Sequence, residues 1–249
     1  MRYLTGNKTR DAAVQRALLD RLSARFERSV ARQLSSTMKA AVRQYEADKS
    51  DFGVEAVILN QQDRLASIMS NEINNVMKVF GERLLNNNGK SLKDMGVDPF
   101  DDALKNYFQV YGLTHVQMIS STTVEQIRGL ISQGEIDGLG VAEIARNITK
   151  QIPTISRYRA NAIARTETHT AANYGSQAAA ESTGLNLLKE WVAATDERTR
   201  EDHLDADGQV VGLSESFDVG GESLAFPGDP SGSPGNIINC RCTVAYLTE

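Results

Sequence analysis

The spacing of apolar side chains changes character near residue 185. Before this point, apolar residues recur at the three- and four-residue intervals of amphipathic helices. After it, short apolar runs alternate with polar residues and are separated by glycine-rich turns, which is typical of strands and loops. The sequence therefore predicts a mainly α fold, in which a long multi-helix N-terminal region is followed by a small, loop-rich α+β C-terminal module.

The first predicted helix extends from Thr9 to Tyr45 without glycine or proline. Its apolar residues recur at every fourth position: Val14, Leu18, Leu22, Phe26, Val30, Leu34, Met38 and Val42. A step of four residues advances about 400°, so the apolar stripe turns by roughly 40° per step around the helix. Either the helix breaks near residues 35–37, or it contacts different neighbours along its length.

Further helix boundaries are expected from capping residues. A second helix over residues 54–86 ends in the stop signal of residues 86–89, three asparagines and a glycine. Asp98 before Pro99 indicates an N-cap followed by proline at the first helical position. Thr122 and Glu125 have the spacing of a capping box, which predicts another helix start at this point.

Proline and glycine bound the alanine-rich part of the chain. A helix after the turn at residues 134–140 is expected to stop at Pro153, because proline lacks the N–H group that continues a helix. A long alanine-rich helix then begins at Thr154 or Ser156, reaches about Ser182, and is closed by Gly184. We therefore divide the chain into residues 1–110, a partner-docking helical region, 111–184, a helical domain, and 185–249, the small α+β module.

The C-terminal module is expected to contain several short strands. Residues 187–193 and 209–211 read as two of them, and residues 214–219 and 223–226 flank the glycine pair of a hairpin, Gly220-Gly221. A last strand is expected over residues 237–246. On such a strand Cys240 and Cys242 would point to the same face.

Charge is distributed unevenly along the chain, which has a net charge of −5. Residues 1–50 carry eleven basic and five acidic side chains, whereas residues 191–249 carry three basic and eleven acidic ones. The basic arm predicts contact with packaged DNA or an acidic protein surface, unless it is only a solvated helix face. The acidic module should repel a phosphate backbone. No signal peptide and no membrane-spanning stretch is recognised, so we expect no membrane partner and a cytoplasmic origin.

Three residues of the module are candidate metal ligands. His203, Cys240 and Cys242 offer the nitrogen and sulfur donors that zinc prefers, with Asp196 or Asp205 as a fourth ligand. The alternative is that both cysteines are small buried apolar residues on one strand face. A catalytic cysteine activated by His203 is disfavoured, because no helix start or glycine-rich turn follows either thiol to lower its pKa.

Other charged residues of the module do not form a catalytic pattern. Asp196 is expected to be an N-cap, and Arg198 and Arg200 to pair with acidic residues that follow, Asp202, Asp205 or Asp207. The sequence contains no P-loop, dinucleotide fingerprint, Ser-His-Asp arrangement or pair of catalytic carboxylates. We therefore expect no catalytic residues, no bound organic cofactor and no enzymatic activity.

The motifs of the C-terminal part occur in a familiar order: Ala164-Arg165-Thr166-Glu167-Thr168, Lys189-x-Trp191, Asp196-x-Arg198-Thr199-Arg200-x-x-His203, Asp207-Gly208-Gln209, Pro227-Gly228-Asp229-Pro230 and Asn239-Cys240-Arg241-Cys242. In this series, which extends over about residues 140–247, the chain resembles the Mu F-like minor head proteins of tailed bacteriophages. These are also called head morphogenesis proteins. Residues 1–110 match no motif of that family.

The resemblance implies a virion protein with no enzymatic activity of its own. It would be present in few copies in the phage head near the portal, after assembly in the host cytoplasm. The expected partners are the portal protein, the major capsid or scaffolding protein, and packaged DNA through the basic N-terminal arm, with a role in head morphogenesis and in DNA packaging or ejection. The residues leave open an alternative, a metal-stabilised or hydrolytic C-terminal domain carried by a helical adaptor.

Overall fold

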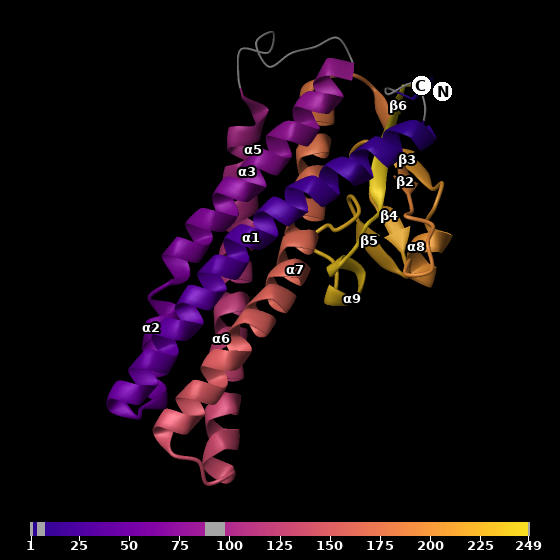
Figure 1. Ribbon diagram of the computed structural model, residues 1–249. Coiled ribbons are helices and arrows are strands. Elements are labelled where there is room, and N and C mark those ends of the chain that lie inside the picture. Colours follow the sequence, from indigo (N-terminus) through magenta and orange to yellow (C-terminus); the bar gives the residue numbers. More distant parts are fainter. Residues whose placement is uncertain (1, 4–7, 88–97, 249) are drawn as a thin grey trace. The chain divides into compact units, whose positions relative to one another are not determined.

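The structure, a computed structural model, describes residues 2–3, 8–87 and 98–248 of the chain. Its N-terminal part is helical and its C-terminal part contains short strands and loops, as the sequence predicts (Figure 1). The helices that precede the strands are α1 Lys8–Asp48, α2 Asp51–Leu59, α3 Gln62–Asn87, α5 Pro99–Tyr107, the π-helix η1 Phe108–Gly112, α6 Leu113–Ile136 and α7 Val141–Ser182. Within the described residues, no helix is long and apolar enough to span a membrane.

Several predicted helix boundaries are confirmed. Helix α1 is unbroken through residues 35–37. The backbone N–H of Phe100 donates to Asp98 Oδ1 at 2.9 Å, as expected for a cap before Pro99. Gly184 follows α7 with a φ of +64°, a conformation that glycine adopts without a steric penalty. The stop signal over residues 86–89 lies partly outside the described residues, but α3 ends at Asn87.

Three predicted boundaries are wrong. The helix expected over residues 54–86 is interrupted at Asn60-Gln61, which separates α2 from α3. Thr122 lies inside α6 and donates to the carbonyl of Met118 at 2.8 Å, so it does not begin a helix. Pro153 lies within α7, whose apolar residues on both sides of the proline, Ile148, Ile152 and Ala160, are buried. Burial of this continuous face outweighs the one backbone hydrogen bond that the proline removes.

The described chain forms two compact units. Unit 1 contains residues 1–24, 72–107 and 164–249, and unit 2 contains residues 25–71 and 108–163. Helices α1, α3 and α7 contribute residues to both units. The division of the sequence at residues 110 and 184 stays a prediction.

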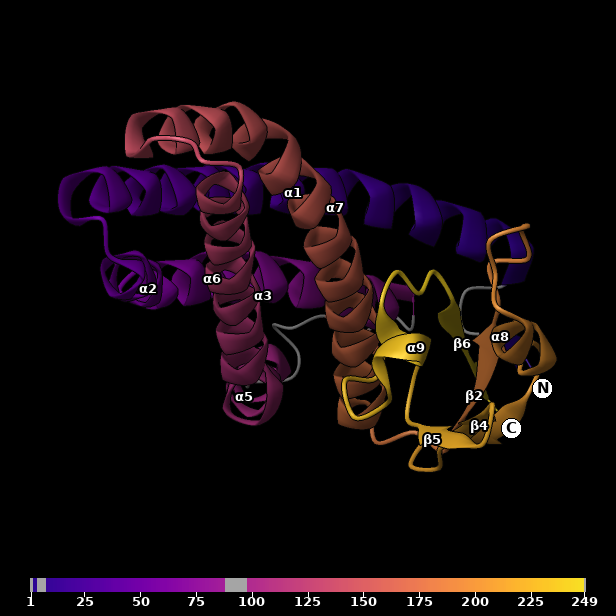
Figure 2. The ribbon, with the colours of Figure 1, turned by 90° about the horizontal axis from the view of Figure 1, so that it is seen from below.

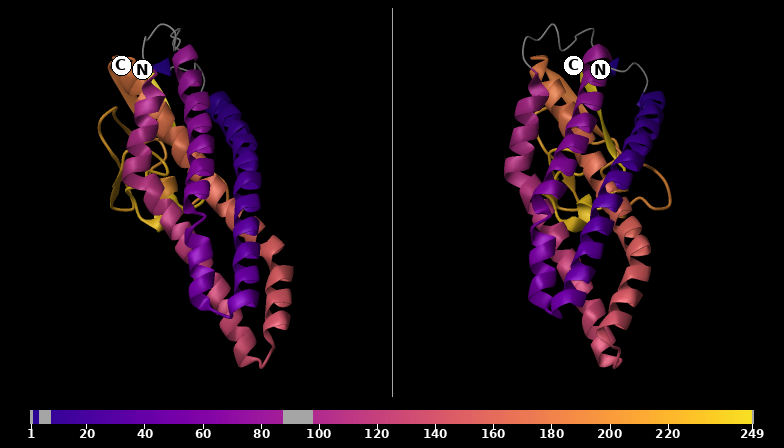
Figure 3. Two further views of the ribbon diagram at one scale, coloured as in Figure 1. Left: turned by 90° about the vertical axis from the view of Figure 1, so that its left-hand side faces the viewer. Right: turned by 60° about the vertical axis from the view of Figure 1, so that its left-hand side comes forward.

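Unit 2 is built from helices around an apolar core. Its connection between α6 and α7 is short (Figure 3). The core combines residues of α1, α2, α6 and α7: Met38, Ala41, Val42, Tyr45, Val54, Ile58, Val124, Ile127, Ile131, Ile144, Ala145, Ile148 and Ile152. A few polar contacts surround this core, such as the 2.6 Å ion pair between Arg128 and Glu55. Burial of these apolar side chains is thus a main source of stability in this unit.

Unit 1 contains two small antiparallel sheets. The first has the strand order β1-β6-β2-β3, and the second is the hairpin β4-β5. Their bounds are β1 Arg2–Tyr3, β2 Leu187–Val192, β3 Val210–Gly212, β4 Phe217–Val219, β5 Glu222–Leu224 and β6 Thr243–Thr248, with the short helices α8 Glu201–Asp205 and α9 Pro234–Ile237 between them. The hairpin at Gly220-Gly221 is confirmed, and both glycines have positive φ values of 60° and 81°.

The last strand differs from its prediction. It begins at Thr243, because Pro234 starts the short helix α9 and Asn239 then adopts a φ of +59°, which is incompatible with an extended strand. Cys240 and Cys242 therefore lie in the segment that leads into β6. Their common orientation has to come from the fold around them.

Small residues allow close approach of helices within unit 1. A Cβ atom on Gly175 of α7 would lie 2.6 Å from the backbone of Met77 in α3, which real contacts do not permit. The core of this unit combines these helices with the sheets and includes the fully buried Trp191 and Phe217. The rings of these two residues meet edge to face, with centroids 5.4 Å apart.

Candidate functional site

One polar face of α7 holds the backbone of the C-terminal loops, which pass beside this helix (Figure 2). The residues of this face recur at intervals of three and four: Thr166, Thr170, Asn173 and Gln177. Thr166 accepts a hydrogen bond from the backbone N–H of Asn239 at 3.1 Å. Gln177 donates to the carbonyl of Leu213 at 2.8 Å. We call these four residues the polar face of α7.

The central residues of the polar face bond two loops at once. Thr170 donates to the carbonyl of Gly228 at 2.8 Å. Asn173 donates to the carbonyl of Pro227 at 2.8 Å and to that of Cys242 at 3.3 Å. The segments around Pro227-Gly228 and Cys242 are thereby fixed against the same turn of helix. Because both segments are irregular, their backbone groups need such side-chain partners when buried.

The turn at Pro227-Gly228-Asp229-Pro230 is fixed from within by Asp229. This buried carboxylate accepts hydrogen bonds from the backbone N–H of Ala225 at 2.7 Å and from the N–H and hydroxyl of Ser231 at 2.9 and 2.8 Å. Gly228 has a φ of +78°, and a Cβ there would lie 3.2 Å from the Thr170 hydroxyl. The turn therefore requires glycine and an acceptor for reasons of folding.

The Asp207-Gly208-Gln209 segment closes the end of β2. Asp207 Oδ1 accepts from the backbone N–H of Ala193 at 2.8 Å. The backbone N–H of Gly208 donates to the carbonyl of Trp191 at 2.9 Å, and the backbone N–H of Trp191 donates to the carbonyl of Gln209 at 3.0 Å. This motif thus extends the pairing with β2 to residues that precede the first residue of β3.

The helical motif at residues 164–169 contains two buried polar side chains. The hydroxyl of Tyr107 donates to Glu167 Oε2 at 2.7 Å. His169 is buried and forms a hydrogen bond with the backbone of Cys242. Burial disfavours the charged imidazolium, which lowers the pKa of His169 to about 4. The motif places these polar groups inside unit 1.

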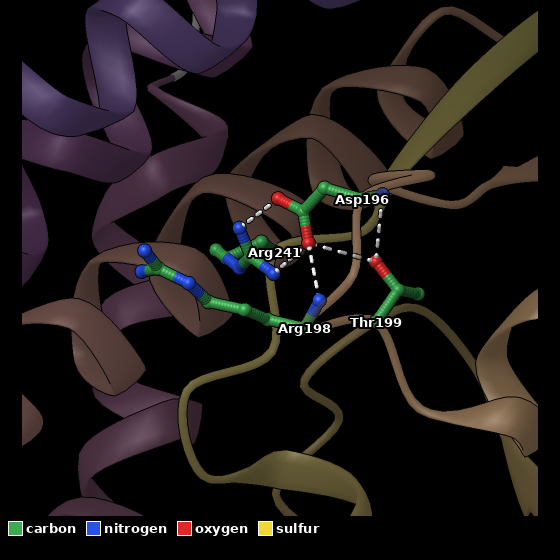
Figure 4. Close-up of polar contacts among 4 residues, drawn as sticks. All are labelled: Asp196, Arg198, Thr199 and Arg241. Carbon is green, nitrogen blue, oxygen red and sulfur yellow. Dashed lines mark hydrogen bonds and ion pairs between the residues drawn. The ribbon is translucent and has the colours of Figure 1, made fainter.

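Asp196 is the centre of a network of polar contacts with Arg241, Arg198 and Thr199 (Figure 4). Arg241 donates to both carboxylate oxygens, with Nη2 2.5 Å from Oδ1. The backbone N–H of Arg198 donates to Oδ1 at 3.0 Å, and the Thr199 hydroxyl is 3.4 Å from the same oxygen. The hydrogen bond from Arg241 is the largest cause that holds the pKa of Asp196 well below its usual range.

This arrangement corrects two expectations. Asp196 does not cap α8; it closes the turn over residues 196–199, and Arg200 is the residue before the helix. Arg200 donates to the carbonyl of Ile238 at 2.5 Å, where we expected pairing with an acidic residue. Neither contact is visible in the sequence, because both partners are about forty residues away.

The three predicted metal ligands are brought together in the same region. His203 on α8 and Cys240 and Cys242 before β6 are all buried, and their ligand atoms lie within 4.8 Å of one another. His203 Nδ1 is 3.4 Å from Cys242 Sγ and 3.7 Å from Cys240 Sγ. Asp196 and Asp205, the suggested fourth ligands, are not part of this group among the described residues.

The surroundings of the group influence its chemistry. The Trp191 ring meets the His203 ring edge to face at 5.5 Å. A hydrogen bond from the Cys240 thiol is the largest cause that lowers the pKa of Cys242 to about 5, and the same pairing with burial raises the pKa of Cys240. The sequence contains no signal for this pairing, because the thiols and His203 come from distant segments. Sequence reasoning also missed Asn236, whose Oδ1 is 3.3 Å from His203 Nε2.

A second feature of unit 1 is a cavity of about 470 Å³ beside Lys189. Its lining includes Glu181, Gln177, Tyr174 and Phe226. Lys189 donates to the carbonyl of Ala225 at 2.8 Å, and burial lowers its pKa to about 8. The lysine of the Lys189-x-Trp191 motif therefore has a structural partner.

Part of the chain is similar to a phage protein family and to individual proteins of phage and bacterial origin. Residues 125–245 match the family described as Phage Mu protein F like protein. Minor head protein GP7 of Bacillus phage SPP1 is 30% identical over 148 residues, which cover 55% of this chain and 46% of that protein. YqbB of Bacillus subtilis, an uncharacterized protein, is 25% identical over 148 residues, or 58% of this chain and 48% of that one.

A third relative is named as an enzyme. NAD(+)--arginine ADP-ribosyltransferase EFV of Enterococcus faecalis is 34% identical over 128 residues, which cover 50% of this chain and 26% of that protein. The chain spans less than half the length of each of these three relatives. No solved structure matches the chain.

Proposed function

Because residues 125–245 of this chain belong to the Phage Mu protein F-like family, we propose that the protein is a minor head protein that binds the portal of a tailed phage and acts in head assembly. The family match, together with a similarity to a minor head protein over 55% of the chain, carries this proposal. In the particle the protein would be present in few copies near the portal. The major capsid or scaffolding protein would be a further neighbour during assembly.

The role of the family motifs supports a structural protein without enzymatic activity. Asp229, Asp207 and the polar face of α7 are occupied with the backbone of neighbouring loops, and Asp196 is paired with Arg241. Because these side chains bond other parts of the same chain, we expect them to stabilise the fold and not to act on a substrate. The module then presents a fixed surface, and the helices provide the contact with other head proteins.

The similarity to an ADP-ribosyltransferase gives a direct test of this point. The aligned segment covers 26% of that protein, so most of the enzyme has no counterpart in the alignment. We expect no ADP-ribosylarginine when the purified chain is incubated with NAD⁺ and an arginine-containing peptide, followed by mass spectrometry. Transfer at a rate above that of a heat-denatured sample would overturn the non-enzymatic proposal.

Exposed apolar side chains of unit 2 are the surface that we expect to contact the portal. Large apolar residues are more than half exposed on η1 and α6, with Val110 at 59%, Leu113 at 55% and Met118 at 58%. An exposed apolar patch is typical of protein contact sites, and we propose that these three residues form part of one. Their replacement by aspartate should weaken portal binding without removing core residues.

Portal binding is tested with purified components. The full chain is mixed with the portal oligomer of the same phage and the complex is measured by co-sedimentation. We expect binding by the wild type, and at least about tenfold weaker binding by Val110→Asp/Met118→Asp, since loss of two buried apolar groups costs more than 1.4 kcal/mol. Ser132→Asp/Thr149→Asp, at exposed helical positions of the same unit, is the matched control. Absence of binding by the wild type would contradict the proposal.

A contact of the basic N-terminal arm with packaged DNA forms the remaining part of the proposal. Residues 1–50 carry eleven basic side chains, and binding to phosphates would release counterions. The affinity of the chain for duplex DNA should therefore fall steeply as salt is raised from dilute to physiological concentration. Affinity that is independent of salt, or no binding in dilute salt, would exclude this contact.

A further inference from the structure

The group His203, Cys240 and Cys242 combines three donor atoms from two separate segments of unit 1. Each residue is at most 2% exposed. Cys240 and Cys242 come from the irregular segment before β6, and His203 comes from α8, 37 residues earlier than Cys240. Nitrogen and two sulfurs that converge in a buried space are the donor set of zinc sites in proteins.

The distances fit one tetrahedral ion. With Zn–N of about 2.05 Å and Zn–S of about 2.3 Å, a tetrahedral angle places nitrogen and sulfur about 3.6 Å apart and two sulfurs about 3.8 Å apart. The nitrogen of His203 lies 3.4 and 3.7 Å from the two sulfurs. All three donor atoms lie within 4.8 Å of one another. An ion can therefore be placed between them with little movement of the chain.

The orientation of the imidazole is fixed by a second residue. Asn236 Oδ1 lies 3.3 Å from His203 Nε2, and the Asn236 amide donates to the carbonyl of Val219 at 3.3 Å. Because the amide nitrogen is engaged with a carbonyl, the oxygen faces the ring and accepts the Nε2 proton. Nδ1 then carries the free lone pair, and it faces both sulfurs. An oxygen acceptor on the distal ring nitrogen is typical of histidine ligands.

The alternative use of the cysteines, as small apolar residues, does not account for these contacts. A packing role needs neither a histidine nitrogen near both sulfurs nor an amide that selects its tautomer. Two thiolates balance the charge of a divalent cation, so the occupied group would be neutral, which suits a buried place beside Trp191. The backbone N–H of Ala194 also forms a hydrogen bond with Cys242, as is suitable for a thiolate acceptor.

We propose that His203, Cys240 and Cys242 bind one zinc ion, with Asn236 as the residue that orients the histidine. The fourth position of the tetrahedron is left to water or to a group from outside these three residues. The ion would join α8 to the segment before β6 and so stabilise a region with little regular structure. Metal binding of this kind contributes directly to folding free energy.

The first experiment measures metal content and geometry in the full chain. We expect one zinc per chain by elemental analysis after reconstitution and removal of free metal. Cobalt substitution should produce the intense visible absorption of a tetrahedral site together with sulfur-to-cobalt charge transfer. Wild-type protein that retains no zinc, and whose melting temperature is the same with and without a chelator, would overturn the proposal.

Variants separate the proposed ligands from other residues. Cys242→Ser and His203→Ala should lose the zinc, whereas His115→Gln, a histidine outside the group, should keep one zinc per chain. Asn236→Ala keeps all three ligands, and we expect about 10–100-fold weaker zinc binding in a competition assay. If the ligand variants fail to fold, the number of zinc ions per wild-type chain and the zinc affinity of Asn236→Ala still test the proposal. Unchanged zinc affinity in Asn236→Ala would reject the role of this residue.

Discussion

The C-terminal module of residues 185–249 and the helical unit 2 are held together by different interactions. In unit 2, apolar side chains at helical spacing form the core, and its polar contacts surround that core. In the module, buried polar groups bond the backbone of loops; they include Asp229 of the module itself and the residues of α7 that face it within unit 1. Helices satisfy their own backbone, whereas irregular loops need side-chain partners. The motifs that resemble those of the Mu F-like proteins include residues that serve as such partners, among them Asp229 and Asp207.

Loss of a large or fully buried core side chain in each region should have the largest effect. Trp191→Ala removes an indole that contacts Phe217 and His203, and we expect a loss of about 3–5 kcal/mol in the free energy of unfolding. Ile127→Ala in the core of unit 2 should cost about 2–5 kcal/mol. Denaturant unfolding of both variants checks these values. A cost below about 1 kcal/mol for Trp191→Ala would contradict its place in the core.

Removal of one polar side chain should distinguish the two regions more sharply. Asn173→Ala leaves the carbonyls of Pro227 and Cys242 without this partner, with an expected cost of about 2–4 kcal/mol. Ser156→Ala in unit 2 removes a hydroxyl that donates to the carbonyl of Ile152 within its own helix, and should cost about 1 kcal/mol or less. Hydrogen exchange of the loop at Pro227 should rise only in the first variant. Equal costs for both variants would argue against the contrast.

Lys189 gives the stability of the module a pH dependence. Burial lowers the pKa of Lys189 to about 8 from 10.5, so between these values the unfolded chain binds more protons than the folded chain. The free energy of unfolding should therefore rise by about 2 kcal/mol from pH 8 to pH 10.5, and this part of the rise should be absent in Lys189→Met. Lys39→Met, at an exposed position of α1, is the control and should keep it. The same pH profile for wild type and Lys189→Met would refute this assignment.

The smallest effect is expected at the surface pair of the module. Asp196→Asn removes the ion pair with Arg241 but keeps an acceptor for the backbone N–H of Arg198. Water and salt screen such an exposed pair, so the melting temperature should fall less than in any variant above, and the difference from wild type should shrink in high salt. A shift as large as that of Asn173→Ala would show that the pair is more than a surface contact.

Burial of apolar residues explains both the helices that the sequence predicts correctly and the helix boundaries that it predicts wrongly. Apolar periodicity predicts the helices, whereas Pro153 and the pair Thr122 and Glu125 indicate helix boundaries through local preference alone. Burial of apolar residues on both sides overrides these local signals, and burial is a tertiary property. The break at Asn60-Gln61 could not be predicted, because neither residue is a glycine or a proline.

The candidate site was predicted in composition but not in arrangement. His203, Cys240 and Cys242 were selected by residue type, and the structure places them together. The two cysteines do not share a strand face, because both precede β6; their common orientation comes from the surrounding fold. Asn236 and the pairing of Asp196 with Arg241 depend on contacts between distant segments, which no spacing in the sequence reveals.

Quantitative mass spectrometry of phage heads purified from cells that encode this chain is the most direct check of the proposed portal-associated minor head protein. We expect the protein in intact heads at a few copies per particle, and its loss from heads assembled without the portal. Heads that contain the portal but lack this protein would contradict its proposed function.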